Sequence, residues 1–375
     1  MNEEVTTQKK RLKNYAIVEG VVRENNLKIG VNSKGSRYIG GDIIVSVSRT
    51  NAQKVRVYVY EKRYDGSPNP NFGNLLTILP DKVVSIAGYL TSIGADETQS
   101  IDNLDQVVWE TASKQATKVW LSGSLEEFVS VYVDEHGQER ERSSFSISAT
   151  NGGIKEVRPN RPFSPRVVVD IDGYIMRKFR ETKRNEDGEN EETGRLGLDL
   201  IYIDYKGVAH KFRLYAPHEE INIKTQGGDS YPFYIDEIVD DNYDEGQTAK
   251  FTVSVLNLVE QKTVMSTSGS GWGTFSEPTI RTTFVHDIII TGGRSTSGID
   301  PDSPDAIAKA DVTAALTRRL EVGRENEARY QNKKNAAPAV APGSGAAWMA
   351  EPQADGAKLG SDFSLDATGG DGFPF

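Results

Sequence analysis

Two segments of the chain place cations and aromatic rings on alternate residues, a spacing that suits contact with a nucleic acid. Successive side chains of a β-strand point to opposite faces, so each segment predicts one apolar face and one cationic, aromatic face. The second kind of face fits single-stranded nucleic acid, because cations neutralise phosphates and rings stack on bases of any sequence. The residues are Lys54, Arg56, Tyr58, Tyr60 and Lys62 in the first segment, and Lys211, Arg213 and Tyr215 in the second.

An exposed strand with ordinary cross-strand tyrosine packing would have the same pattern, so one such segment favours packing rather than binding. Both segments, however, fall on the third predicted strand of a β-rich block. Their repetition at equivalent places favours a binding function.

Other aromatic residues are candidates for the same contact. Tyr38 lies beside Arg37 in a glycine-rich turn. Trp272 lies between glycines in a predicted loop, where its indole could stack on a base or fold back over the end of a barrel. Three more aromatics lie on or near a predicted hairpin: Trp120, Phe128 and Tyr132.

Residues that could carry catalysis are few. The four histidines are scattered without metal-ligand spacing, and the chain has no cysteine. No phosphate-binding glycine loop or nucleophile elbow is found. Four carboxylates on two predicted strands could hold Mg²⁺ as in two-metal nucleases, or could simply face solvent: Asp170, Asp172, Asp199 and Asp204. The sequence therefore predicts a protein that is not an enzyme and uses no cofactor or metal.

The elements that would position these residues form two β-rich blocks. The first block is residues 15–158, with a helical segment at 98–115 and a turn at 134–138. Its predicted strands are 16–22, 40–48, 55–60, 83–90, 118–133 and 143–149. The second block is residues 166–296, with an acidic loop at 181–193 and a glycine-rich loop at 268–273. Its predicted strands are 167–179, 196–205, 208–215, 249–258 and 282–291.

Each block has about five principal strands, with a helical or irregular piece before the fourth. This count and order predict the oligonucleotide-binding (OB) fold, a five-stranded Greek-key barrel whose second and third strands form the binding face. An immunoglobulin-like sandwich of about seven strands is the competing fold. We therefore expect a mostly β protein with two tandem OB-fold barrels.

The remaining segments predict connections and ends. Residues 1–14 are polar and basic and predict a flexible arm, and the prolines of residues 159–165 predict a linker. An N-cap serine and a proline predict a helical segment at 303–334. Residues 335–375 are rich in Ala, Pro, Gly and Ser, cannot bury enough surface to fold and are expected to be disordered.

The acidic residues are concentrated outside the predicted strands. The whole chain has a formal net charge of −10, yet residues 181–193, 236–245 and 335–375 alone carry −4, −6 and −4. The rest of the chain is therefore mildly basic, with a net charge of +4. This distribution permits an anionic ligand.

The chain ends on an acid, a proline and two aromatics: Asp371, Gly372, Phe373, Pro374 and Phe375. An exposed apolar tip of this kind is typical of a docking peptide. The tip resembles the acidic, Pro-Phe-ending tail of bacterial and phage single-stranded-DNA-binding proteins. Residues 119–149 resemble the fourth strand, hairpin loop and fifth strand of the same family.

This resemblance implies an OB domain that binds single-stranded DNA and a tail that recruits replication and repair proteins. The usual family member has one such domain and assembles as a tetramer, so the two domains predicted here put that assembly in doubt. The acidic insert at 181–193 also departs from the family pattern.

These features together predict sequence-independent binding and protection of single-stranded DNA in replication, recombination and repair. A structural or adhesive β-protein, such as a virion component, is the alternative, and a Mg²⁺-dependent nuclease is the third. The sequence shows no signal-peptide pattern and no run of roughly 20 apolar residues that would cross a membrane. We therefore expect a cytoplasmic location, in a bacterial cell or a phage-infected host.

Overall fold

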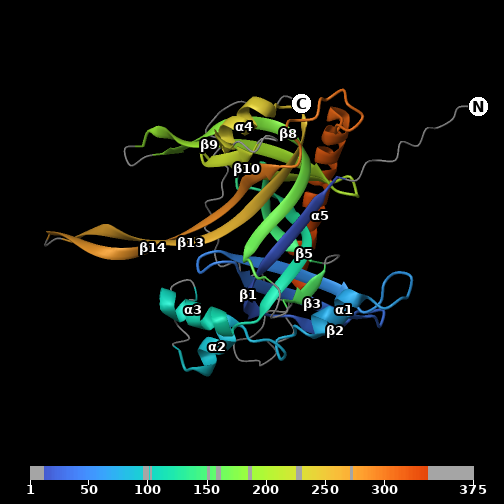
Figure 1. Ribbon diagram of the computed structural model, residues 1–375, viewed down its shortest axis with the longest axis vertical. Coiled ribbons are helices and arrows are strands. Elements are labelled where there is room, and N and C mark those ends of the chain that lie inside the picture. The colour runs from blue at the N-terminus through green and yellow to red at the C-terminus, as the bar shows by residue number, and fades with distance from the viewer. Residues whose placement is uncertain are drawn as a thin grey trace, which may run out of the picture. The chain divides into compact units, whose positions relative to one another are not determined.

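A computed structural model describes residues 12–95, 101, 104–149, 153–157, 162–184, 188–224, 230–270 and 273–336. The described part of the chain is mostly β, as predicted (Figure 1). Two compact units divide the chain, residues 1–327 and residues 328–375, and both β-rich blocks lie in the first.

The first block closes into a five-stranded barrel. Hydrogen-bonded neighbours follow the order β1, β3, β4, β6, β5 and back to β1, and only β4 and β6 are parallel. This is a closed Greek-key order of the OB type. The strands are β1 (Asn14–Asn25), β3 (Arg37–Ser46), β4 (Ala52–Tyr60), β5 (Lys118–Val133) and β6 (Glu139–Ser148), with short strands β2 (Lys28–Val31) beside β3 and β7 (Ile154–Glu156) beside β5.

Three helices separate the third and fourth strands of this barrel: α1 (Pro70–Leu76), α2 (Ile86–Ser92) and α3 (Gln106–Gln115). The helix α3 lies within the predicted helical segment. The predicted strand at 83–90 is wrong, because Ser85 caps α2 there by accepting a hydrogen bond from the Gly88 amide at 3.0 Å. Ile86 and Leu90, four residues apart, are both buried. A short apolar run fits either a buried strand or one face of a helix, and here the Ser85 N-cap indicates the helix.

The second block repeats the same topology. Its neighbours follow the order β8, β9, β10, β14, β13 and back to β8, and β10 with β14 is again the parallel pair. A small hairpin and a helix precede the fourth strand, where the sequence predicted a helical or irregular piece. The elements are β8 (Arg166–Arg184), β9 (Asn190–Ile203), β10 (Ala209–Ala216), β11 (Glu220–Lys224), β12 (Ser230–Tyr234), α4 (Ile235–Asn242), β13 (Thr248–Ser270) and β14 (Gly273–Gly293). The chain therefore contains two tandem OB-fold barrels.

Two predicted loops of the second block are largely strand. In the acidic stretch, β8 continues to Arg184 and β9 begins at Asn190, and the register pairs Lys183 with Glu191. Opposite charges at directly paired positions stabilise such a ladder. Residues 268–270 and 273, predicted as a loop around Trp272, belong to β13 and β14. Trp272 itself lies outside the described residues.

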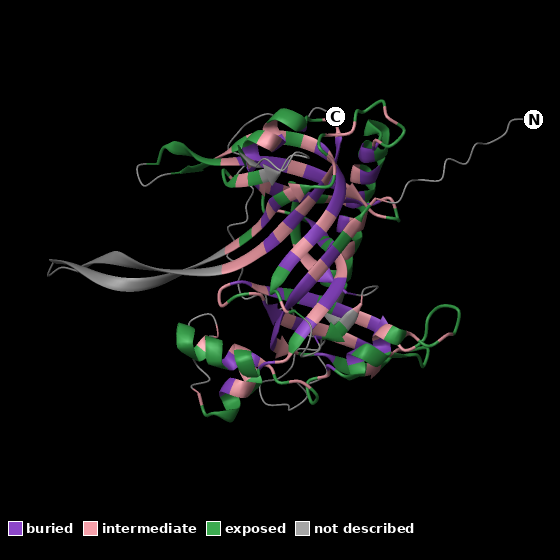
Figure 2. Ribbon diagram, in the orientation of Figure 1, coloured by how far each residue is buried: buried purple, intermediate pink, exposed green. Residues whose placement is uncertain are grey.

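Both barrels have the apolar interior that the alternating pattern predicted. Val55, Val57 and Val59 are each at most 1% exposed, and Phe212 and Leu214 are also buried. Figure 2 shows buried residues running along the strands of both barrels. The alternation therefore sets which side chains of β4 and β10 lie on the outer face.

Backbone and side-chain contacts join the two barrels. The strand β1 pairs with β8 from Asn14 opposite Ile171 to Glu19 opposite Arg166, so one sheet runs through both barrels. A buried amide network adds to this ladder, since Gln53 donates to the Val255 carbonyl (2.9 Å) and accepts from Asn257 (2.6 Å).

In the predicted linker, residues 159–161 lie outside the described residues and Phe163 packs against the cluster around α2 and α3.

The helix α5 (Lys309–Ala336) follows the second barrel. It begins later than predicted, because Ser303 caps a turn instead, accepting from the Asp305 amide at 3.2 Å. Val312 and Ala315 pack against Ile201 and Ala209 of the second barrel. Arg319 is 1% exposed and bonds Glu127 and Glu141 of the first barrel together with the Ala209 carbonyl of the second. The first turns of α5 therefore contact both barrels.

Among the described residues, no helix is long and apolar enough to span a membrane. Most of the predicted basic arm (residues 1–11) and of the predicted tail (residues 337–375, with the tip at 371–375) lies outside the described part of the chain.

Candidate nucleic-acid interface

The second and third strands of each barrel carry the same four residues in the same register. In the first barrel, Gly40 and Asp42 on β3 lie opposite Tyr58 and Arg56 on β4. Directly opposed positions of an antiparallel pair lie on the same face of the sheet, so the four side chains form two adjacent rows. We call this arrangement the Gly-Asp/Arg-Tyr unit of the first barrel.

The second barrel has the same unit. Gly197 and Asp199 on β9 lie opposite Tyr215 and Arg213 on β10. A third strand extends both rows, because Phe179 on β8 lies opposite Gly197 and Arg177 lies opposite Asp199. The arginine and tyrosine were predicted from the sequence, whereas the glycine and aspartate could be recognised only once the strand register was known.

The glycines of the two units leave room for aromatic rings. A Cβ atom on Gly40 would lie 3.1 Å from the Tyr38 ring and 3.2 Å from the Tyr58 ring. A Cβ atom on Gly197 would lie 2.4 Å from the Phe179 ring, closer than real contacts allow. Aromatic side chains that lie across strand glycines are a known way to stabilise a sheet. Here they also lay flat rings on the outer face of each barrel.

Tyr38, Tyr58 and Tyr60 form an aromatic cluster on the first barrel, which we call the tyrosine cluster. The ring centroids of Tyr38 and Tyr58 are 4.7 Å apart, and those of Tyr58 and Tyr60 are 5.3 Å apart with perpendicular planes. The two hydroxyls of Tyr58 and Tyr60 are 3.2 Å apart and share a hydrogen bond. Tyr60 is 38% exposed, so the cluster is open to solvent at that edge. The tyrosine cluster therefore has the ring area that base stacking requires.

The hydrogen bond between Tyr58 and Tyr60 shifts the pKa values of the two phenols in opposite directions. The bond to Tyr60, with burial second, raises the pKa of Tyr58 to about 12. The same bond, with that to Asn32, lowers the pKa of Tyr60 from its usual value. Tyr60 therefore ionises first, and its phenolate accepts the hydrogen bond that the Tyr58 hydroxyl donates.

The cations of the first face are partly paired. Lys54 contacts Asp42 at 2.9 Å, and Arg37 contacts Glu61 at 2.8 Å with its guanidinium 5.8 Å from the Phe72 ring. Arg56 is exposed and has no ion-pair partner within the part of the chain that the structure describes. Lys62, two residues after the end of β4, is likewise exposed. This face therefore offers at least one uncompensated guanidinium beside the tyrosine cluster.

The cations of the second face are held by carboxylates. Asp199 accepts from Arg177 at 3.0 Å and from Arg213 at 2.9 Å. Both guanidiniums lie over the Phe179 ring, at 4.8 and 5.1 Å from its centroid. Burial, which opposes the charge, is outweighed by the bond to Asp199, so the pKa of Arg213 is raised. Arg177, Asp199 and Arg213 thus form one charged row, and both arginines of that row stack on the Phe179 ring of the neighbouring row.

Arg195 and Tyr215 complete the second face. The Arg195 guanidinium lies 4.0 Å from the Tyr215 ring centroid and pairs with Glu181 (3.0 Å) and Asp287 (2.9 Å). Burial, with Glu181 nearby, raises the pKa of Tyr215, which therefore stays neutral at physiological pH.

Lys211, predicted as a contact of this face, reaches the first barrel instead. Its Nζ lies 3.2 Å from Glu141, and its amide donates to Glu127 at 2.7 Å. These contacts place Lys211 at the junction of the two barrels, beside Arg319.

The hairpin of β5 and β6 presents the other predicted aromatics. Phe128 is 51% exposed and Tyr132 is 37% exposed, and Arg142 lies 5.6 Å from the Tyr132 ring. Trp120 is half-buried near β7, with the Lys155 ammonium 4.6 Å from its ring. Phe128 and Tyr132 therefore share an open, aromatic and cationic side of the hairpin, whereas Trp120 lies near the start of β5.

Sequence reasoning missed Arg177, Phe179, Arg195 and Arg142. The first two alternate on β8 just as the cations and rings of β10 do, so the same period-two pattern was present in residues 177–179. The signal was obscured because the neighbouring Lys178 and Arg180 make the run look uniformly charged.

Cations or backbone amides occupy the carboxylates considered for a metal site. Asp170 contacts Lys13 at 2.6 Å, and Asp172 bonds Arg294. Asp199 accepts from Arg177 and Arg213 on the second face, and Asp204 accepts from the backbone amides of its own turn. Within the described ranges, no group of three or more potential ligands is placed to hold a metal ion.

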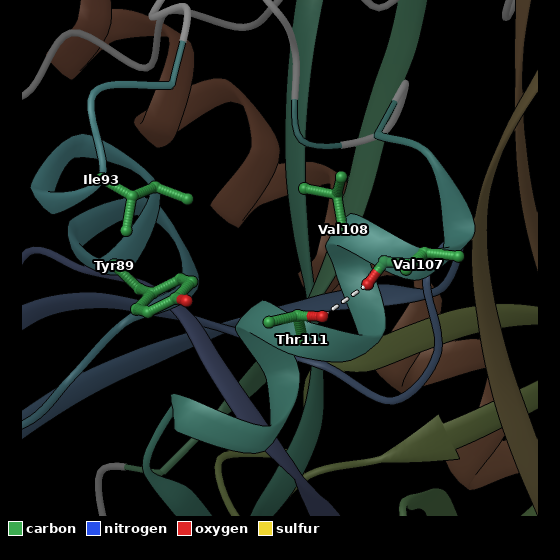
Figure 3. A pocket seen from close by; sticks show the side chains of 5 residues that line it. All are labelled: Tyr89, Ile93, Val107, Val108 and Thr111. Atoms are coloured by element: carbon green, nitrogen blue, oxygen red, sulfur yellow. Dashed lines mark hydrogen bonds between the residues drawn. The ribbon is translucent and has the colours of Figure 1, made fainter.

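An apolar cleft of about 150 Å³ lies between α2 and α3 (Figure 3). Its lining includes Val107 and Ile93, which are 70% and 56% exposed. None of its five lining residues is charged. The lining residues are Tyr89, Ile93, Val107, Val108 and Thr111.

Comparison with known proteins gives one family and distant structural neighbours. Residues 102–328 match the sequence profile of the family YorF. The wild-type single-stranded DNA binding protein from Thermus aquaticus matches with a TM-score of 0.32 and 10% identity, over 66% of this chain and 87% of that one. A deletion mutant of that protein matches with a TM-score of 0.31 and 11% identity, over 66% and 88% of the two chains. A search of curated proteins found no match.

Proposed function

The chain belongs to the YorF family, and we propose that its two barrels bind single-stranded DNA, without preference for sequence, through the outer faces of β3–β4 and β8–β10. The proposal is one of binding without catalysis. Its support is the geometry of the two faces.

One observation carries the proposal: the Gly-Asp/Arg-Tyr unit is repeated on the second and third strands of both barrels. The two barrels differ elsewhere in sequence. The packing of a barrel does not by itself require an arginine and a tyrosine at these positions of the register. In OB folds these two strands form the ligand face. A duplicated face suits one extended, repetitive ligand that meets both barrels, and a nucleic-acid strand is such a ligand.

The chemistry of the faces fits a single strand better than a duplex. Tyr60 is exposed and Tyr38 is partly exposed, so unpaired bases can stack on the tyrosine cluster, which contributes ~1–3 kcal/mol per base. In a duplex the bases are already stacked on each other and offer no free ring face. Arg56 and the arginines of the second face supply the charge for the phosphates, so the affinity should fall with salt.

The role that we propose is protection of single-stranded DNA during replication, recombination and repair. In this proposal the C-terminal residues 371–375, which lie outside the described residues, recruit proteins of those processes. Their support is the sequence alone, an acid beside two aromatics and a proline.

The test is a salt-titrated fluorescence anisotropy measurement on labelled oligonucleotides of equal length, one single-stranded and one double-stranded. We expect tight binding to the single strand, with log K falling linearly with log salt by about 0.7 per neutralised phosphate, and weak binding to the duplex. Tyr58→Ala and Tyr215→Ala should each weaken binding by ~1–3 kcal/mol, whereas Tyr64→Ala, a fully exposed tyrosine outside both faces, should not. Equal affinity for duplex and single strand, or no binding at low salt, would refute the proposal.

A further inference from the structure

We infer that the aspartate of each repeated unit, Asp199 in the second barrel and Asp42 in the first, limits affinity for single-stranded DNA by holding cations that would otherwise meet phosphate. This inference rests on the proposed function and adds to it a control of affinity that is built into the face. It also predicts that the two barrels are unequal.

Asp199 is placed between two arginines rather than beside one. Its Oδ2 accepts from Arg177 and its Oδ1 accepts from Arg213, so both carboxylate oxygens are occupied. The Asp199 side chain is 25% exposed, and the Arg177 and Arg213 side chains are 56% and 35% exposed, so the row lies where a ligand can reach it. A phosphate that approaches either guanidinium must share its positive charge with this carboxylate.

On the first barrel, Asp42 neutralises less cationic charge than Asp199 does on the second. It contacts Lys54 at 2.9 Å, while the equivalent arginine, Arg56, has no ion pair within the described part of the chain. On the second barrel, Arg195 is also paired, with Glu181 and Asp287. The second face is therefore the more neutralised of the two, and a strand should bind the first face more tightly.

The aspartate is not required to keep the arginines over the ring. Arg177 and Arg213 lie on the Phe179 ring, and contacts of this type are attractive in their own right. Asparagine in place of Asp199 keeps the shape and one acceptor oxygen, removes the charge, and loses the hydrogen bond to one of the two arginines, which the ring contact still holds. The substitution Asp199→Asn should therefore leave both guanidiniums in place and free their charge for phosphate.

The inference is tested by anisotropy on full-length Asp199→Asn, with binding to a single-stranded oligonucleotide measured across a range of salt concentrations. We expect several-fold tighter binding at low salt and a log–log slope that is steeper by about 0.7 for each additional phosphate that the freed arginines neutralise. Asp42→Asn should act in the same direction but less, because only Lys54 is freed. Asp81→Asn is the matched control, since it removes one exposed carboxylate and frees Lys82 (3.0 Å) outside both faces.

The outcomes separate this inference from the function on which it rests. If the unmodified protein does not bind single-stranded DNA, the proposed function fails and the inference fails with it. If the unmodified protein binds, but Asp199→Asn and Asp42→Asn bind no tighter than Asp81→Asn, the inference alone is overturned. A folded Asp199→Asn variant that binds more weakly would show that the aspartate positions the arginines for the strand, and would also overturn it.

Discussion

The hydroxyl pair of Tyr58 and Tyr60 makes the charge of the first face depend on pH. The bond that raises the pKa of Tyr58 to about 12 also lowers that of Tyr60 below its usual value of 10.0. As pH rises through the lowered pKa, Tyr60 gains a negative charge within the tyrosine cluster. That charge repels phosphate, so alkaline pH should oppose binding before the other tyrosines ionise.

We therefore predict that affinity for single-stranded DNA falls as pH rises toward 10, measured by anisotropy at constant ionic strength. In Tyr60→Phe this fall should shift to higher pH, since the phenol that ionises first is gone. An ultraviolet titration of the same variant should show that the tyrosine transition at about pH 12 moves to lower pH, because Tyr58 has lost its acceptor. An unchanged pH profile in Tyr60→Phe would contradict the role of this pair.

At the scale of elements, α5 is tied to the barrels by a buried charge. Arg319 donates to both oxygens of Glu127 and also bonds Glu141 and the Ala209 carbonyl. The side chains of Arg319 and Glu127 are only 2% and 3% exposed. A second pair on the same helix, Arg324 with Glu139, is about half exposed on both sides.

This contrast predicts different outcomes for the two arginines. Arg319→Ala leaves the buried Glu127 without its charged partner, and we expect a loss of about 3–5 kcal/mol in the free energy of unfolding. Arg324→Ala should lose at most about 1 kcal/mol, because exposed pairs contribute little. Urea unfolding of the two variants measures the difference directly, and equal stabilities would show that α5 is not held by the Arg319 contacts.

The elements also show which parts of the structure could be predicted from sequence. The alternation in residues 54–62 placed Val55 inside and Arg56 outside correctly, because period two is a direct consequence of strand geometry. The strand 118–133 was predicted with the bounds of β5. The helix α2 was missed, because a short run of apolar and small residues fits either structure until a cap is recognised.

Other features required knowledge of the register. Gly40 and Gly197 matter only because of the rings that lie across them, and those rings come from neighbouring strands whose pairing the sequence alone does not give. Arg319 gave no signal, since a charged residue in a polar helix predicts a solvated face. Its burial follows from Glu127 and Glu141, which are almost two hundred residues earlier in the chain.

At the scale of the molecule, the two barrels form one continuous sheet through β1 and β8 and share the α5 contacts. The repeated unit therefore occurs twice within one compact unit rather than on two independent domains. Acidic residues of the segments 181–193 and 236–245 pair with arginines of the second barrel, as Glu181 does with Arg195 and Asp236 does with Arg180. These features together support one ligand that meets two faces of similar chemistry and unequal affinity.

The most direct test of the central claim is photocrosslinking of the full-length protein to single-stranded DNA that carries a photoreactive base, followed by mass-spectrometric mapping of the adducts. Bases that stack on the two faces should crosslink to Tyr38, Tyr58 or Tyr60 on the first barrel and to Phe179 or Tyr215 on the second, with more adduct on the first. Adducts that map only to other surfaces, such as the cleft between α2 and α3, would contradict the account.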